Sequence, residues 1–293
     1  MTLSWRSLLF VPLNAPRLLE KAHLRAADAI ILDLEDAVPA AAKAAARARL
    51  PEEAARLAGL GVSVVVRVNT AWLDLIEDLP VAVHPAVRAV MVPKVEDAGH
   101  LRAVSAMMSE LEARRGLPDG QTGLLALVET PAGLGEIVAL AAISRVRGLA
   151  LGSEDYAASL GVPPSPAALA LPCQMLVLAA RARGLMALAV AGSLADFKDL
   201  AAYGSNVAAA RAMGATGALC VHPAQVGVAN AAFGLTAAEL AWAEKVVAVW
   251  AEAERSGAGV GKLDGHMIDK PVVDRARKVL AFHDVGPVIE ASN

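Results

Sequence analysis

Short apolar runs alternate with longer alanine-rich stretches eight times along the chain. The runs are almost continuously apolar, as strands buried on both faces of a parallel sheet require, and the stretches between them suit crossover helices. Eight repeats in 293 residues favour closure into a (β/α)8 TIM barrel of the α/β class over an open doubly wound sheet. The expected strands are residues 7–12, 29–36, 62–69, 89–96, 124–130, 149–155, 187–192 and 218–223.

The chain continues beyond the eighth expected strand. We expect residues 1–234 to form the barrel and residues 235–293 to form a C-terminal helix and lid segment of the same structural domain, able to contact a neighbouring subunit. Thr236 and Glu239 have the spacing of a capping box at the start of this helix. The glycine-rich stretch 257–265 indicates a hinge or loop before a last element.

Several classes of function are disfavoured by composition. Lys and Arg number 27 against 30 Asp and Glu, without a long basic run, so nucleic acid is not an expected partner. Apolar stretches such as 185–191 are too short to cross a bilayer, and the N-terminus lacks a signal-peptide pattern, which predicts a cytoplasmic protein without a membrane partner. The strands lack a dinucleotide glycine fingerprint. Cys173 and Cys220 are expected to be buried thiols.

Polar side chains replace apolar ones at the ends of six expected strands. Barrel active sites lie at the carboxyl ends of the strands, so a ring of convergent acids with one arginine indicates a site. The residues concerned are Asp33, Glu35, Asp36, Arg67, Asn69, Lys94, Glu96, Glu129, Glu154, Asp155 and His222.

Glu129 and Asp155 end neighbouring expected strands, where two carboxylates share either a proton or a cation. Mg²⁺ prefers oxygen ligands, keeps several waters and needs one or two protein carboxylates, so this pair fits it. The sequence lacks zinc-type spacing, and His222 stands alone, as a structural histidine or a ligand.

The chemistry that follows is an aldol or Claisen cleavage. Mg²⁺ chelated by a 2-oxo acid would polarise its carbonyl, and Arg67 could hold the oxygen that becomes negative. Backbone N–H groups at residues 131–133 and 152–154 would suit a small carboxylate at a helix N-terminus. Pro131, Ala132, Gly152 and Ser153 are therefore candidate substrate contacts.

The chain resembles the citrate lyase β-subunit-like family of the HpcH/HpaI aldolase superfamily, which includes malyl-CoA, β-methylmalyl-CoA and citramalyl-CoA lyases. The resemblance covers residues 7–280 and rests above all on ILDLEDAV (31–38), ALVETPAG (126–133) and GSEDYAASLG (152–161). It implies that Glu129 and Asp155 bind Mg²⁺ or Mn²⁺ and that Arg67 contacts the keto acid. It also implies that Glu35 and Asp36 lie just outside the ligands, where they reach metal-bound water and belong to the catalytic residues with Arg67 and Asp269. It also makes Arg17, Lys21 and Arg25 candidates for the phosphates of coenzyme A.

The C-terminal segment 264–276 resembles the lid of the CoA-dependent lyases, in which an aspartate reaches a neighbouring subunit's site. Asp269 matches that aspartate, which implies a homotrimer or a hexamer. The chain departs from the family pattern at Leu13, Ala15 and residues 171–174, which leaves the acyl group open.

The leading hypothesis is thus a Mg²⁺-dependent carbon–carbon lyase. It would cleave malyl-CoA, methylmalyl-CoA or citramalyl-CoA into a thioester and a 2-oxo acid. A malyl-CoA thioesterase on the same scaffold remains an alternative. So do a citrate lyase β-subunit that acts on a citryl thioester in a multi-protein complex, and an aldolase for free dihydroxy acids.

Overall fold

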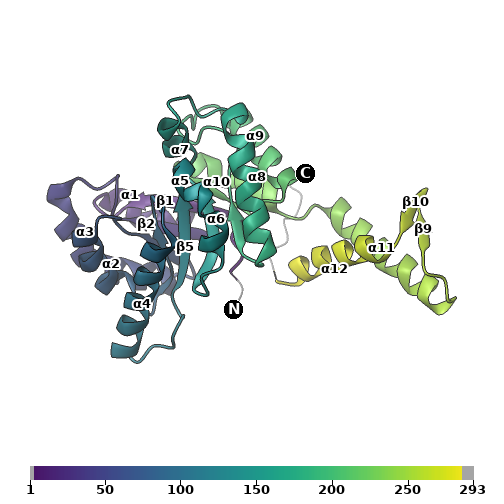
Figure 1. Cartoon of the computed structure of the whole chain (residues 1–293), viewed down its shortest axis with the longest axis horizontal. Coiled ribbons are helices and arrows are strands. Elements are labelled where there is room, and N and C mark those ends of the chain that lie inside the picture. The colour runs from purple at the N-terminus through teal and green to yellow at the C-terminus, as the bar shows by residue number, and fades with distance from the viewer. Residues whose placement is uncertain (1–2, 286–293) are drawn as a thin grey trace. The chain divides into compact units, whose positions relative to one another are not determined.

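A computed structural model describes residues 3–285 of the chain, which divides after Ala232 into two compact units. Each unit is described by itself. The first holds the predicted barrel, and the second holds the C-terminal helix and the segment that resembles a lid (Figure 1).

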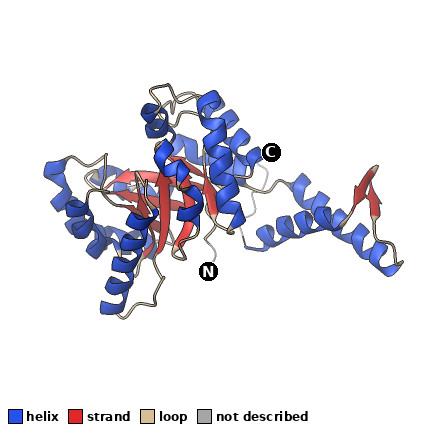
Figure 2. Cartoon of the chain, in the orientation of Figure 1, coloured by secondary structure: helices blue, strands red, loops and turns tan. Residues whose placement is uncertain are grey.

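Within the described residues of the first unit, eight parallel strands pair in the order β7-β6-β5-β4-β3-β2-β1-β8. Helices surround this sheet (Figure 2), so the predicted (β/α)8 barrel is confirmed. The strands are β1 Ser7–Pro12, β2 Ala29–Asp33, β3 Ser63–Arg67, β4 Val87–Val92, β5 Gly123–Val128, β6 Val146–Leu151, β7 Met186–Leu188 and β8 Ala218–Cys220.

The ring closes between the two edge strands. Leu188 of β7 forms a parallel bridge with Gly217, and the N–H of Ala189 donates to the carbonyl of Gly217 at 3.1 Å. A Cβ added at Gly217 would lie 2.2 Å from the carbonyl oxygen of Trp5. Glycine is therefore needed where the chain closes the barrel.

Strand burial follows from the sequence. Every residue of β2 and β5 is buried, because one face of each strand fills the barrel and the other packs on helices. The helices of the first unit are α1 Pro16–Glu20, η1 Ala22–Arg25, η2 Ala40–Ala42, α2 Lys43–Gly59, α3 Trp72–Ala82, α4 Ala98–Arg114, α5 Pro131–Gly135, α6 Ile137–Ala141, α7 Ser153–Ser159, α8 Pro166–Ala182, α9 Leu200–Met213 and α10 Pro223–Phe233.

Several expected strands are too long at their carboxyl ends. The strand expected over 149–155 ends at Leu151, and α7 begins at Ser153, so Asp155 lies in the first turn of a helix. The strand expected over 29–36 ends at Asp33, whose Oδ1 accepts the N–H of Glu35 at 3.0 Å. One backbone hydrogen bond to the neighbouring strand still follows each end, from the N–H of Leu34 to Arg67 and from that of Gly152 to Val128, and the chain then leaves the sheet.

The second unit consists of α11 Ala237–Arg255, the hairpin strands β9 Gly261–Leu263 and β10 His266–Ile268, and α12 Lys270–Val285. The predicted capping box at Thr236 and Glu239 is confirmed. The loop expected over 257–265 is wrong in part, because Asp264 and Gly265 form a two-residue hairpin turn with φ of 48° and 83°. The buried core of the second unit consists of Ala243, Val246, Ile268, Val273 and Ala276.

By length and composition, the stretch Pro223–Arg255 is apolar enough to cross a membrane. In the structure it is two helices, α10 and α11, interrupted at residues 234–236, and α11 carries Glu244 and Lys245 near its middle. The expectation that the chain has no membrane partner stays a prediction.

Candidate active site

A cavity of about 250 Å³ opens at the carboxyl ends of the barrel strands. Arg67 at the end of β3, Glu129 just after β5 and Asp155 in the first turn of α7 all line it. Its apolar wall includes Phe10, Leu127 and Val221. The structure therefore brings together, in one cavity, the three residues that the sequence singled out for metal and substrate binding.

Arg67 is held by two carboxylates. Its Nε and Nη2 donate to the two oxygens of Asp33 at 2.8 and 2.7 Å, and its Nη1 lies 3.0 Å from Oε2 of Glu35 without hydrogen-bond geometry. Burial lowers the pKa of Arg67, but the paired carboxylates outweigh burial and raise it above its ordinary value. The guanidinium also lies over the ring of Phe10, at 4.7 Å. Asp33 thus occupies one bidentate edge of Arg67, and the remaining N–H groups are left for a ligand.

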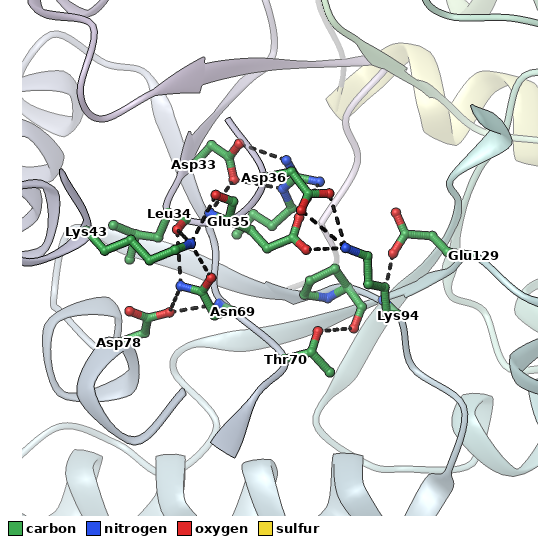
Figure 3. Close-up of polar contacts among 12 residues, drawn as sticks. Asp33, Leu34, Glu35, Asp36, Lys43, Asn69, Thr70, Asp78, Lys94 and Glu129 are labelled. Carbon is green, nitrogen blue, oxygen red and sulfur yellow. Dashed lines mark hydrogen bonds and ion pairs between the residues drawn. The ribbon is translucent and has the colours of Figure 1, made fainter. Parts of the chain in front are cut away.

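Glu35 and Asp36 lie beside this pair and share the ammonium group of Lys94 (Figure 3). Lys94 Nζ is 2.7 Å from Oε1 of Glu35 and 3.2 Å from each oxygen of Asp36. Burial raises the pKa of Glu35, although Arg67 and Lys94 oppose the shift. Neither acid is among the residues that line the cavity; Glu35 contacts Arg67 and Lys94, and Asp36 contacts Lys94.

The loop that carries these acids is fixed through its main chain (Figure 3). Lys43 Nζ donates to the carbonyls of Leu34 and Glu35 at 2.9 and 3.1 Å, and Asn69 Nδ2 donates to the carbonyl of Leu34 at 3.1 Å. The side chains of Glu35 and Asp36 therefore extend from an anchored backbone.

Glu129 is 2% exposed, and its Oε2 accepts the backbone N–H of Lys94 at 2.7 Å. Burial, and then the negative charge of Asp155, raise the pKa of Glu129 to about 8, although the N–H of Lys94 and the charge of Arg67 oppose them. A Cβ added at Gly152 would lie 2.7 Å from Oε1 of Glu129. The buried carboxylate of Glu129 is therefore confined by the N–H of Lys94 on one side and by the backbone at Gly152 on the other.

The two acids of α7 differ in what they contact. Glu154 Oε1 accepts hydrogen bonds from Ser193 Oγ at 2.6 Å and from the N–H groups of Leu194 and Ala195 at 2.7 and 3.0 Å. Both acids line the cavity, but Asp155 is exposed there, and its charge acts on Glu129. Because successive residues point about 100° apart on a helix, Glu154 fastens a neighbouring loop while Asp155 faces the same space as Glu129.

These residues fit a hard divalent cation. Four carboxylates line the cavity, of which Asp33 is paired with Arg67 and Glu154 accepts hydrogen bonds from residues 193–195. Glu129 and Asp155 are the other two, and burial together with the charge of Asp155 raises the pKa of Glu129, as expected for a buried negative charge that the positive charge of Arg67 does not fully offset. Ser153 Oγ is buried there without a hydrogen-bond partner in the part of the chain that the structure describes. No group of three or more His, Cys, Asp or Glu among those residues is placed to hold a metal ion, so their side chains alone do not form a closed cage. Mg²⁺, which keeps water and substrate oxygens as ligands, suits this arrangement.

A second cavity of about 410 Å³ adjoins the first, since Phe10, Pro12 and Val221 line both. Arg25 lines the second cavity but not the first, whereas Arg17 and Lys21 are exposed on and just after α1. His222 also lines it, and its ring stacks on Phe197 at 4.4 Å.

Other expected contacts lie elsewhere. Pro131 and Ala132 are exposed on α5 and are not among the cavity-lining residues, and the N–H of Gly133 is taken by Thr130 Oγ1 at 3.2 Å. Asp269 belongs to the second unit, where its Oδ1 accepts the N–H of Val272 at 3.3 Å at the start of α12. Substrate contact by these residues stays a prediction.

Two functional-site residues received no specific role from the sequence. Asp33 pairs with Arg67 because β2 and β3 place the two residues opposite each other, a register that strand pairing could have indicated. Lys94 contacts three carboxylates, which its place among the polar strand ends did not reveal.

Residues 6–223 match the family described as HpcH/HpaI aldolase/citrate lyase. A (3S)-malyl-CoA thioesterase of Cereibacter sphaeroides is 37% identical over 98% of this chain and 98% of its own length. A citrate lyase subunit beta-like protein of Deinococcus radiodurans is 35% identical over 94% of this chain and 96% of its own. The crystal structure of CitE from Mycobacterium tuberculosis with magnesium, acetoacetate and coenzyme A has a TM-score of 0.74 and 31% identity, and covers 95% of this chain and 97% of that one.

Proposed function

Because the chain belongs to the HpcH/HpaI aldolase/citrate lyase family, we propose that it is a Mg²⁺-dependent carbon–carbon lyase for a short hydroxy-carboxyacyl-CoA thioester. The observation that carries the proposal is the cavity in which Glu129 and Asp155 face the same space as the fixed cation of Arg67. Malyl-CoA, methylmalyl-CoA and citramalyl-CoA are the candidate substrates. The CitE structure, which contains magnesium and coenzyme A, supports both the metal and the thioester.

Glu129 and Asp155 would hold the ion, with Ser153 Oγ free to bind a substrate or water oxygen beside it. Mg²⁺ supplies Lewis-acid polarisation of the 2-oxo acid's carbonyl when it is bound. Arg67, oriented by Asp33, directs its remaining N–H groups to the oxygen that carries negative charge as the carbon–carbon bond breaks. Because Asp33 holds the guanidinium of Arg67 before the substrate arrives, little free energy is needed to orient the guanidinium during the reaction.

The bond changes define the acid and base that are needed. A base takes the proton of the substrate hydroxyl, and the electrons of the breaking bond form the enolate of the departing thioester, whose carbon is then protonated. We assign this last proton to Asp269 of a neighbouring subunit in a homotrimer or hexamer, or to a water it holds. Glu35 and Asp36 act as positioning residues, because Glu35 contacts Arg67 and Lys94, Asp36 contacts Lys94, and neither lines the cavity.

The second cavity suits the arm of coenzyme A. Its apolar wall continues from the first cavity through Phe10 and Pro12, and Arg25 offers a charge for a phosphate farther along. Arg17 and Lys21 are exposed nearby in sequence and could meet the same phosphates.

A malyl-CoA thioesterase is the second candidate, supported by the relative of that name at 37% identity. Product analysis separates the two activities. The purified chain is incubated with each candidate thioester, with Mg²⁺ or with EDTA, and released 2-oxo acid and free thiol are measured separately. We expect Mg²⁺-dependent 2-oxo acid without free thiol. Thiol release with a hydroxy acid would replace the lyase by the thioesterase.

A citrate lyase β-subunit acting in a complex would behave differently in the same assay, because its thioester is presented by another protein. Under that hypothesis the purified chain leaves every free CoA thioester unchanged and turns over a citryl thioester when partner subunits are added. Turnover of a free CoA thioester would exclude it as the sole activity.

A further inference from the structure

Lys94 has an unusual backbone conformation for a residue with a side chain. It follows β4 with a φ of 50°, in the left-handed region that L-residues with a Cβ disfavour. Hydrogen bonds fix the main chain on both sides of it. Thr70 Oγ1 donates to the carbonyl of Pro93 at 2.9 Å, and the N–H of Val95 donates to the carbonyl of Leu127 at 3.3 Å.

The two ends of Lys94 contact different carboxylates (Figure 3). Its backbone N–H donates to Glu129 Oε2 at 2.7 Å, while its Nζ lies 2.7 Å from Glu35 and 3.2 Å from Asp36. The left-handed backbone is what aims the N–H at Glu129, and the side-chain contacts favour that backbone by holding the ammonium group. Sparsely populated backbone conformations persist where surrounding contacts determine them, commonly at functional sites.

We propose that Lys94 is a positioning residue that couples the acidic pair Glu35 and Asp36 to the metal ligand Glu129. Its ammonium holds the left-handed turn in place, and the turn occupies Oε2 of Glu129, which leaves Oε1 as the oxygen for the cation. This inference rests on the proposed function, because it takes Glu129 to be a ligand.

Two substitutions separate the contributions of the backbone and the side chain. Lys94→Ala removes the ammonium but keeps the Cβ, so the turn keeps only the flanking hydrogen bonds at Pro93 and Val95, and the disfavoured φ at residue 94 can relax away from Glu129. Lys94→Gly removes the same ammonium, but glycine adopts a positive φ readily, so the N–H can stay on Oε2. If Lys94 contributed to the site through its charge alone, the two variants would behave alike.

The experiment measures Mn²⁺ binding without substrate, from the electron paramagnetic resonance signal of free Mn²⁺, for the full-length wild type, Lys94→Ala, Lys94→Gly and Glu129→Gln. We expect Lys94→Ala to bind Mn²⁺ about tenfold more weakly, which corresponds to about 1.4 kcal/mol, and Lys94→Gly to stay within about threefold of wild type. Both should lower kcat more than they raise KM, since both release Glu35 and Asp36. Circular dichroism melting shows that each variant is folded before binding is compared.

The outcomes distinguish this inference from the proposed function. If wild type does not bind Mn²⁺, or Glu129→Gln binds it equally well, the proposed metal site fails. If binding depends on Glu129 but Lys94→Ala and Lys94→Gly weaken it equally, or neither weakens it, the coupling through the left-handed turn is wrong.

Discussion

Gly152 is the position where a single added methyl group should damage the metal site most selectively. An ideal Cβ there would lie 2.5 Å from Cγ and 2.7 Å from Oε1 of Glu129, closer than non-bonded atoms approach. The backbone is not the obstacle, because φ at Gly152 is −84°, which alanine can adopt. The Gly152→Ala substitution therefore forces Glu129 to move.

The magnitude follows from what Glu129 would lose. Overpacking a buried position costs about 1–3 kcal/mol, which for a unit of this size lowers Tm by roughly 2–12 °C. If the carboxylate swings away, it also loses the N–H of Lys94 at 2.7 Å, and a hydrogen bond to a charged group contributes about 1.5–3 kcal/mol. We expect Mn²⁺ affinity to fall by about ten- to a hundredfold.

The measurement pairs thermal melting with Mn²⁺ titration, and Gly227→Ala is the matched control. Gly227 lies within α10, an added Cβ meets nothing within 4 Å, and its φ is not positive, so alanine there should leave Mn²⁺ binding unchanged and stability equal or slightly higher. Should Gly152→Ala melt and bind Mn²⁺ like wild type, the close packing of Glu129 against Gly152 is not part of the site.

Three further predictions follow from the same geometry. Arg67→Lys should lower kcat by roughly a hundredfold or more, because an ammonium group cannot bind both oxygens of the buried Asp33 and still face the substrate. A kcat within about twofold of wild type would give Arg67 a structural role. The pKa of Glu129 is raised to about 8, so below that pH a cation must displace a proton from its carboxyl group. The apparent Mn²⁺ affinity should therefore rise by up to about tenfold per pH unit from pH 6 to 8 and then level off. Calorimetric titrations at several pH values test this, and an affinity that does not change with pH would count against it. Mixing inactive Asp269→Asn chains with inactive Glu129→Ala chains should restore part of the activity if Asp269 serves a neighbouring subunit's site; subunit exchange without recovery would show that the site is not shared.

The sequence predicted the barrel because apolar continuity is a property of whole strands, whereas strand ends depend on single hydrogen bonds. Residues 149–155 were expected to be one strand, yet the chain turns at Gly152 and starts α7 at Ser153. The acids that follow Ser153 are a helix-start signal that would have corrected this boundary. Likewise Asp264-Gly265 is a hairpin signal inside a stretch that we expected to be a loop.

Within the site, the sequence identified the residue types at the cavity but not their partners. Glu154 and Asp155 are chain neighbours of the same charge that both line the cavity, and the helical rotation between them directs Glu154 to Ser193 while the charge of Asp155 acts on Glu129. Nothing local in the sequence indicates that Lys94 adopts a positive φ, because its carboxylate partners follow β2 and β5 and meet only in the folded barrel. The family resemblance is confirmed, while the roles of the individual site residues, from the metal ligands Glu129 and Asp155 to Asp269, Arg17 and Lys21, stay predictions.

The central claim is that a divalent cation binds in the barrel mouth between Glu129 and Asp155. Anomalous diffraction from crystals grown with Mn²⁺ tests it most directly, because the anomalous signal locates the ion without reference to activity. We expect one strong peak within about 2.0–2.3 Å of a carboxylate oxygen of Glu129, with Asp155 as the second protein ligand. A strong peak elsewhere, with none between these two carboxylates in crystals whose Mn²⁺ concentration saturates the protein in solution, would contradict the claim.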